Sequence, residues 1–324
     1  MDISESFFSE NYDLIFSSGV WSIGTERKVL IGEKENKLCR FCGKDESSTS
    51  FNNVSHAIPE SLGNKTFIAL EECDTCNEEF AQGIEDSLDK YLKPYRTLAH
   101  IKGKKKIPTT KSRDKKSRLD VNEQLIIQSP EGSGFYSLDI DNKKLKLKID
   151  REPYIPCDVY KAFMKIAMSV VKDKNELSAF RYTIAWIMHK NRNENMLNPL
   201  KVWQTFIPGH RTIGDVSTML FRIKSSDNYT KLPYSIFILG ISNYIYQMIV
   251  PSHLDVNESG EDINFHMPFL PTIFDQSMVH GKPTRSIIDL TGSEKTYDEV
   301  PILIMFKSIG AVTDRSRTER HLND

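Results

Sequence analysis

Four of the five cysteines stand in two pairs whose spacing is typical of a metal site. Cys39 and Cys42 form one C-x-x-C pair, and Cys73 and Cys76 form a second pair after an insert of thirty residues. Two such pairs supply four thiolates, which is the ligand set of a tetrahedral structural Zn²⁺ site. A unit of this size has little core of its own, so a bound metal would supply folding energy. We predict one structural zinc ion held by all four cysteines.

The cysteines also allow less specific interpretations. They could form two unrelated buried pairs, or redox motifs, although the thioredoxin-like βαβ pattern that redox activity needs is absent from the sequence. Cys157 falls in an apolar segment and is expected to be an ordinary buried residue. The N-terminus lacks the pattern of a secretory signal, and the longest apolar stretch, 234–251, is interrupted by polar residues. We therefore expect a cytoplasmic protein that makes no membrane contact.

Three polar residues in and after the insert could perform chemistry. His56 is expected at the end of a short strand, where a neutral imidazole could take a proton from water near pH 7. Asn77 directly follows the second cysteine pair, where Asn could equally cap the helix that begins there. If 76–92 forms one helix, Glu85 lies beside its apolar face, whereas Asp86 points away. Each residue also has a purely structural interpretation, as a packing histidine, a helix cap and a solvated acid.

The order of these motifs closely resembles the HNH endonuclease family in its zinc-containing form. The sequence runs C-x2-C, then SHAIPESLGN, then E-C-x2-C-N-x2-F, over residues 39 to about 92. In that family a β-hairpin followed by a helix, the ββα-metal fold, surrounds one divalent metal. The resemblance implies that His56 is the general base, that Asn77 orients the hairpin and that Glu85 binds the catalytic Mg²⁺ or Mn²⁺.

One position departs from the family pattern. Many members carry Asp, Glu or His immediately before the base as a second metal ligand, but this chain has Ser55. A hydroxyl binds divalent cations poorly, so the metal would be held by Glu85, by water and by the substrate phosphate. Mg²⁺ tolerates such a shell because it keeps several of its waters. We expect weak metal binding, or a site that is completed only when substrate is bound.

A strongly basic segment follows the motif region directly. The chain has a formal net charge of −1, yet residues 71–89 hold eight acids and no base, and residues 93–118 hold eleven bases and one acid. Lysines and arginines in such a run can neutralise DNA phosphates without reading sequence. A solvated, flexible linker is the alternative. The candidate nucleic-acid contacts are Lys102, Lys104, Lys105, Lys106, Lys111, Arg113, Lys115, Lys116 and Arg118.

The remaining segments predict an α+β fold with two principal domains. We expect a lead segment at 1–36, helical over 4–16, then the HNH domain with its basic linker at 37–118, a C-terminal mixed α+β domain at 119–314 and a disordered tail at 315–324. In the C-terminal domain, helices are expected at 158–173 and 176–190, and 235–241 and 244–251 flank a Ser-Asn turn as a hairpin. That domain is expected to be a sensor, regulatory or oligomerisation module.

These observations favour a metal-dependent DNA endonuclease, with a role in bacterial defence against phage or foreign DNA suggested by analogy of layout. Two alternatives stay open. The zinc unit could be a non-catalytic nucleic-acid-binding module, an interpretation that Ser55 favours. The chain could also be a nuclease subunit that is active only within a larger complex, through an activating ligand, a partner protein or a homo-oligomer.

Overall fold

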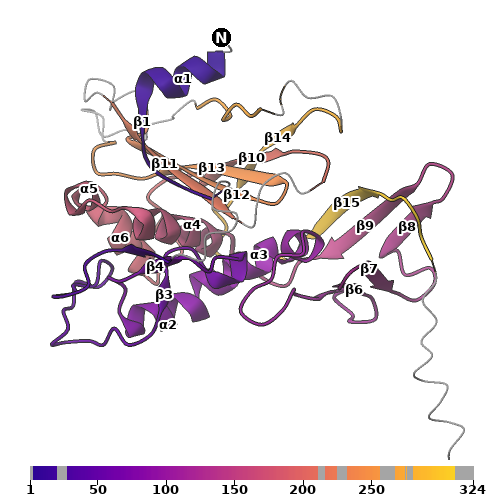
Figure 1. Cartoon of the computed structure of the whole chain (residues 1–324), viewed down its shortest axis with the longest axis horizontal. Helices are drawn as coiled ribbons and strands as arrows, with labels where there is room; N and C mark the ends of the chain where they lie inside the picture. The colour runs from indigo at the N-terminus through magenta and orange to yellow at the C-terminus, as the bar shows by residue number, and fades with distance from the viewer. Residues whose placement is uncertain are drawn as a thin grey trace, which may run out of the picture.

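The computed structural model describes residues 3–19, 28–210, 216–224, 232–255, 267–273, 275 and 280–310, and it confirms an α+β fold (Figure 1). The predicted tail at 315–324 lies outside the described residues. No helix in the described part of the chain has the length and apolar character that crossing a membrane requires. How the chain divides into domains stays a prediction.

The motif-bearing region folds as a small sheet followed by two helices. Its elements are β2 (Val29–Ile31), β3 (Ser55–His56), the short 3₁₀ helix η1 (Glu60–Leu62), β4 (Phe67–Ala69), α2 (Asp74–Gln82) and α3 (Ile84–Leu98). The strand order is β2-β4-β3, with β3 antiparallel to β4 and β2 parallel to it. This arrangement confirms the expected hairpin and the place of His56 at the end of its first strand.

The prediction of one continuous helix over 76–92 is wrong. The helix breaks at Gly83, whose backbone (φ −114°, ψ −101°) belongs to neither α2 nor α3. Glycine adopts such a backbone readily because it carries no Cβ. The apolar residues on each side of the break still pack inward, with Phe80 on α2 and Leu88 on α3 both buried.

A six-stranded antiparallel sheet forms the opposite side of the molecule. Its order is β1-β11-β12-β13-β10-β14, with bounds β1 (Tyr12–Ser18), β10 (Lys201–Phe206), β11 (Ser217–Ile223), β12 (Ser235–Ile241), β13 (Tyr244–Val250) and β14 (Thr284–Asp289). The expected hairpin of β12 and β13 is confirmed, and Ser242 in its turn adopts a left-handed φ of 57°.

The N-terminal segment joins this sheet. Helix α1 (Ile3–Asn11) ends early, and β1 pairs with β11 from Tyr12 opposite Ile223 to Ser18 opposite Thr218. The prediction of helix as far as residue 16 is therefore wrong for residues 12–16. Buried Tyr12 and Phe16 give β1 its attachment to the core, a preference that appears only once β11 is beside it.

Two three-stranded sheets form a projecting region with its own small core. The strands are β5 (Thr110–Lys111), β6 (Arg118–Val121) and β7 (Leu125–Gln128) in one sheet, and β8 (Tyr136–Asp139), β9 (Lys144–Asp150) and β15 (Glu299–Met305) in the other. The prediction that 93–118 is loop or mobile linker is thus wrong at its two ends. Helix α3 runs on to Leu98 because Tyr95 and Thr97 are buried, and β5 pairs with β6.

Helix α4 (Pro156–Val170) lies between the six-stranded sheet and the motif-bearing region, and every one of its residues is buried (Figure 1). It packs against α3 on one side and β12 on the other. The second helix expected in this part is divided into α5 (Lys174–Ser178) and α6 (Arg181–Met188), with buried Phe180 between them. One continuous hydrophobic core therefore joins the motif-bearing region, α4 and the large sheet.

Candidate active site and zinc centre

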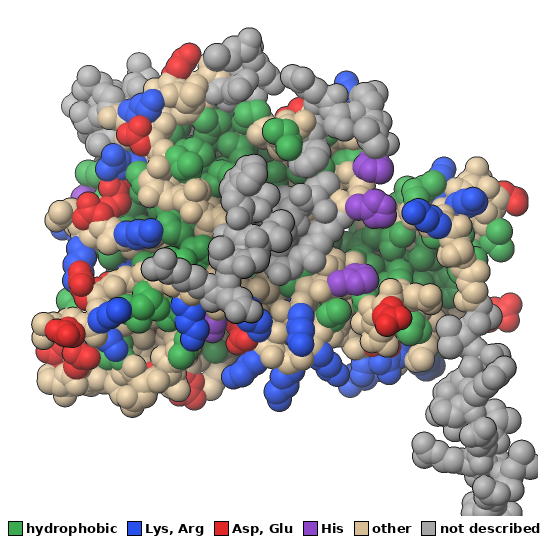
Figure 2. Space-filling view, viewed as in Figure 1, with side chains coloured by type: hydrophobic (Ala, Val, Ile, Leu, Met, Phe, Trp, Pro, Cys, Tyr) green, Lys and Arg blue, Asp and Glu red, His purple; other side chains and the backbone are tan. Residues whose placement is uncertain are grey.

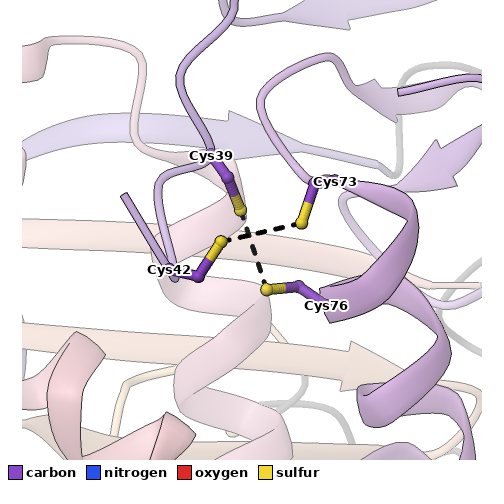
Figure 3. A group of neighbouring side chains, drawn as sticks. All are labelled: Cys39, Cys42, Cys73 and Cys76. Atoms are coloured by element: carbon purple, nitrogen blue, oxygen red, sulfur yellow. Dashed lines mark hydrogen bonds between the residues drawn. The ribbon is translucent and has the colours of Figure 1, made fainter. Parts of the chain in front are cut away.

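The four predicted zinc ligands converge on one point (Figure 3). All four sulfur atoms lie within 4.8 Å of one another, with Cys39 Sγ 3.8 Å from Cys76 Sγ and Cys42 Sγ 3.7 Å from Cys73 Sγ. A tetrahedron with Zn–S bonds of ~2.3 Å has edges of about 3.8 Å between sulfurs. The donor set and its spacing thus fit a structural Zn²⁺ ion, with no position left open for water. Cys157 is buried elsewhere, as expected.

Buried Arg40 joins the first cysteine pair to the rest of the fold. Its backbone N–H donates to the Glu71 carbonyl at 2.9 Å, and its Nη2 lies 2.9 Å from Glu71 Oε2. Its Nη1 donates to the carbonyls of Met168, at 2.6 Å, and Val171, at 3.1 Å, at the C-terminal end of α4. A cation at a helix C-terminus is favourable, because the last carbonyls lack partners within the helix. The zinc unit is therefore attached to α4.

His56 is half-buried at the end of β3. Burial lowers its pKa below the ordinary value of 6.5, and the charges of Lys165 and Lys65 act in the same direction. Glu60 and Glu85 oppose that shift without reversing it. The imidazole is accordingly neutral near pH 7, which is the form that accepts a proton.

The hairpin that carries His56 is held by Asn64, a residue that the sequence analysis missed. Asn64 is buried, and its Nδ2 donates to the carbonyls of Ile58, at 2.6 Å, and Phe67, at 3.0 Å. Its Oδ1 accepts from the backbone N–H groups of Thr66 and Phe67, both at 3.0 Å. The same Nδ2 lies 3.5 Å from His56 Nδ1. The Gly63-Asn64 pair between the two strands was the available signal, since Gly-Asn marks a turn.

Asn77 is half-buried and lies on α2, near the zinc cluster. The helix begins at Asp74 with Cys73 as its N-cap, so the interpretation of Asn77 as a helix cap is wrong. Its backbone N–H donates to the Cys73 carbonyl at 2.9 Å. The backbone of the hairpin is held by the side chain of Asn64. The functional role of Asn77 remains a prediction.

Glu85 lies in the first turn of α3 and faces a buried cation from a distant segment. Lys165 Nζ, on α4, is 2.9 Å from Glu85 Oε1 and 3.0 Å from Glu72 Oε2. The same Nζ donates to the His56 carbonyl at 3.3 Å. The sequence analysis gave no role to Glu72, which it quoted only as part of the second cysteine motif, and it missed Lys165, because a lysine in an apolar helix carries no motif. The structure thus connects His56 and Glu85 through one ammonium group.

Burial and the neighbouring charges oppose each other in this cluster. Burial raises the pKa of Glu72 to about 7, although the charge of Lys165 acts in the opposite direction. Burial also lowers the pKa of Lys165, but the charges of Glu72 and Glu85 outweigh that effect and the net shift is upward. Lys165 is therefore a permanent cation at neutral pH.

Ser55, where the family commonly has a metal-binding side chain, is turned into the protein. It is 1% exposed, and its Oγ donates to the Glu72 carbonyl at 3.3 Å. Within the described residues, the four cysteines are the one group of three or more His, Cys, Asp or Glu side chains arranged to hold a metal. A divalent ion at Glu85 would therefore have at most two such protein ligands among the described residues and would take the others from water and phosphate, which suits Mg²⁺.

The structure brings part of the basic segment together. Lys102, Lys105, Lys106 and Arg118 line one groove of about 650 Å³, and Arg118 pairs with Asp120 at its side. Lys104 is exposed in the same loop. The other four candidates lie on β5 or in the turn that follows it, and all are exposed: Lys111, Arg113, Lys115 and Lys116. Figure 2 shows Lys and Arg side chains gathered along the lower edge of the molecule, below α3 and toward β6 and β7.

The basic loop is attached to the hairpin region. Lys65 Nζ donates to the Gly103 carbonyl at 3.3 Å and pairs with Glu60 at 2.5 Å. Arg96 Nη1 donates to the Ser61 carbonyl, which fastens η1 to α3. The loop at 102–106 therefore starts beside the segment that follows His56.

The comparison with protein families agrees with this geometry. The family model of the HNH endonuclease matches residues 39–93, so this part of the chain is an HNH endonuclease domain carrying a four-cysteine cluster. No curated protein and no solved structure matches the chain. The match supports a nuclease-type enzyme.

Proposed function

We propose that the chain is a metal-dependent endonuclease that hydrolyses phosphodiester bonds of DNA. The observation that carries the proposal is the environment of His56. It stands at the end of the hairpin strand of an HNH domain, its pKa lies below its ordinary value, and Asn64 holds the hairpin beneath it.

In the proposed reaction, neutral His56 takes a proton from water as the water oxygen attacks phosphorus in line with the leaving oxygen. The P–O bond to the 3′ oxygen breaks, which gives a 5′-phosphate and, once protonated, a 3′-hydroxyl. Asn64 keeps the base in place through the backbone of the hairpin. A divalent ion at Glu85 would supply positive charge to the phosphate as negative charge develops there.

DNA binding is proposed through the groove lined by Lys102, Lys105, Lys106 and Arg118. Its position supports the proposal, because the same loop is fastened to the segment that follows His56. Contacts of this kind add affinity without sequence discrimination. A role in defence against foreign DNA, a cytoplasmic location and a regulatory or oligomerisation function for the C-terminal part belong to the same proposal.

A non-catalytic nucleic-acid-binding module is the second candidate. The pairing of Glu85 with Lys165 and the inward turn of Ser55 favour it, because they leave few ligands for a catalytic metal. The two candidates differ in whether DNA is cut at all.

The test is cleavage of supercoiled plasmid by wild type and His56→Ala, each with Mg²⁺, Mn²⁺ or EDTA. The proposal expects nicking by wild type only with a divalent metal, and nicking by the variant that is slower by ~10²–10⁴-fold. His189→Ala is the matched control, since His189 is an exposed histidine at the end of α6 and lies outside residues 39–93. Equal zinc content shows that each protein is folded. Tight, salt-sensitive DNA binding without cleavage under any metal or partner condition would favour the binding module.

A further inference from the structure

Lys165 comes from outside the HNH domain, yet its charged end lies inside that domain. It belongs to α4, is 1% exposed and reaches Glu72, Glu85 and the His56 carbonyl. Its Nζ also lies 5.6 Å from the centre of the Phe80 ring. Fully buried lysines are rare because the desolvation of an ammonium group is costly. The cost of burying this ammonium group is therefore offset by groups from three elements of that domain.

The cluster holds one cation for two carboxylates. Glu72 is completely buried, and Lys165 is the cation within 4 Å of it among the described residues. Glu85 is different, because its side chain is 17% exposed and can reach water or a ligand on its outer side. An ammonium group and a divalent ion both seek the same carboxylate oxygens, so each weakens the binding of the other.

We infer that Lys165 is a positioning residue of the nuclease site, an internal counter-cation that holds Glu85 against α4 and competes with the catalytic divalent ion for it. This inference rests on the proposed function, in which Glu85 is the metal ligand. It makes metal occupancy depend on the position of α4. Because α4 also packs on the six-stranded sheet and receives Arg40 at its C-terminal end, a shift of this helix would change Glu85 and the zinc unit together.

The inference is tested by titration of the full-length protein with Mn²⁺, followed by electron paramagnetic resonance, at a pH where His56 is neutral. The principal variant is the pair Lys165→Met with Glu72→Gln. It removes the ammonium group that faces Glu85 without leaving Glu72 as a buried carboxylate that has lost its partner, so the direct competition at Glu85 is relieved. We expect Mn²⁺ to bind about tenfold more tightly, equivalent to ~1.4 kcal/mol. Adding Glu85→Gln to this pair is expected to abolish the gain.

Lys161→Met is the matched control, since Lys161 lies one turn earlier on α4, is similarly buried and donates to the His189 carbonyl at 2.7 Å instead. It should leave the Mn²⁺ affinity at the wild-type value. Should the principal pair lose zinc, Lys165→Gln with Glu72→Gln keeps a polar pair in the same space and carries the same expectation.

The outcomes separate this inference from the proposed function. If wild type binds Mn²⁺, Glu85→Gln weakens that binding and the paired variants bind no more tightly, competition by Lys165 is refuted while the metal site stands. If Glu85→Gln leaves the Mn²⁺ affinity unchanged, Glu85 is not a metal ligand. The competition by Lys165 and the proposed metal-binding role of Glu85 then both fail. A gain in the paired variants that Glu85→Gln abolishes supports the inference.

Discussion

The zinc cluster and the Glu85 cluster lie in the same small domain but are built in opposite ways. Four cysteines from residues 39–76 converge with sulfur spacing that fits one ion, and within the described residues all four ligands come from that segment. At Glu85 two carboxylates converge on a lysine that belongs to α4. The zinc site takes all its ligands from its own segment, whereas the Glu85 cluster receives its cation from a distant helix.

Under the proposed function, this difference would let one domain combine a structural metal with a catalytic one. Four thiolates around zinc leave no open position, so that site serves the fold. In the proposed function, a single, partly exposed carboxylate that also pairs with an ammonium would bind a metal weakly and would respond to its neighbours.

The largest expected effect, on zinc content and folding, comes from removing one of the four zinc ligands. Cys73→Ser should reduce bound zinc from one ion per chain to nearly none and unfold the HNH region, because structural zinc contributes ~10–16 kcal/mol of binding free energy that is coupled to folding. Zinc analysis and circular dichroism measure both effects. Cys157→Ala, at the buried cysteine outside the cluster, is expected to keep its zinc. A Cys73→Ser protein that retains one zinc and its fold would contradict the four-cysteine site.

His56→Ala tests whether His56 is the general base of the proposed reaction. Loss of a general base is expected to slow plasmid cleavage by ~10²–10⁴-fold with zinc content unchanged. Initial rates under saturating Mn²⁺ measure the effect. Cleavage at the wild-type rate would remove His56 from the mechanism.

The pH dependence of cleavage sharpens that test. Burial keeps the pKa of His56 below 6.5, and the base acts only when it is neutral. The rate should therefore be level near pH 7 and fall about tenfold for each unit below the pKa of His56. A midpoint above pH 6.5 would contradict the depressed pKa.

Asn64 and Asn77 offer a direct contrast within the domain. Asn64→Ala removes a buried side chain that makes four hydrogen bonds of 3.0 Å or less to the hairpin backbone, and should lower the free energy of unfolding by about 2–3 kcal/mol. Asn77→Ala, at a half-buried position on α2, should change it by less than ~1 kcal/mol. Denaturant titration measures both. If Asn77→Ala instead slows cleavage at unchanged stability, Asn77 acts in the reaction itself.

The smallest effect is expected on DNA affinity. Replacing Lys102, Lys105 and Lys106 with Ala should weaken binding equally across sequences, and the salt slope of log K should fall by about 0.9 for each phosphate that is no longer neutralised. Fluorescence anisotropy at several salt concentrations measures the slope. Lys144, Lys146 and Lys148 on β9 provide a control set of equal charge. If both sets lower the DNA affinity equally, the affinity depends on the net charge of the protein and the groove is not the binding site.

The sequence alone determined the features that depend on neighbouring residues. The convergence of the four cysteines, His56 at the end of a short strand and the Ser-Asn hairpin turn all appear in the structure as predicted, because local patterns of ligands, strand ends and turns indicate them. The same reasoning failed at Gly83, where one glycine divides a helix whose apolar pattern continues on both sides.

The contacts between distant segments, in contrast, follow from tertiary packing and could not be read from the sequence. Strand β1 needs β11 beside it, Asn64 acquires its role when two strands close around it, and Lys165 reaches Glu85 because α4 packs against α3. A buried lysine cannot be told from a surface lysine in the sequence. The desolvation of its ammonium group and the carboxylates that pair with it both depend on the folded structure. Local motifs therefore identified the four-cysteine cluster and the family of residues 39–93, and packing determined which distant side chains lie beside them.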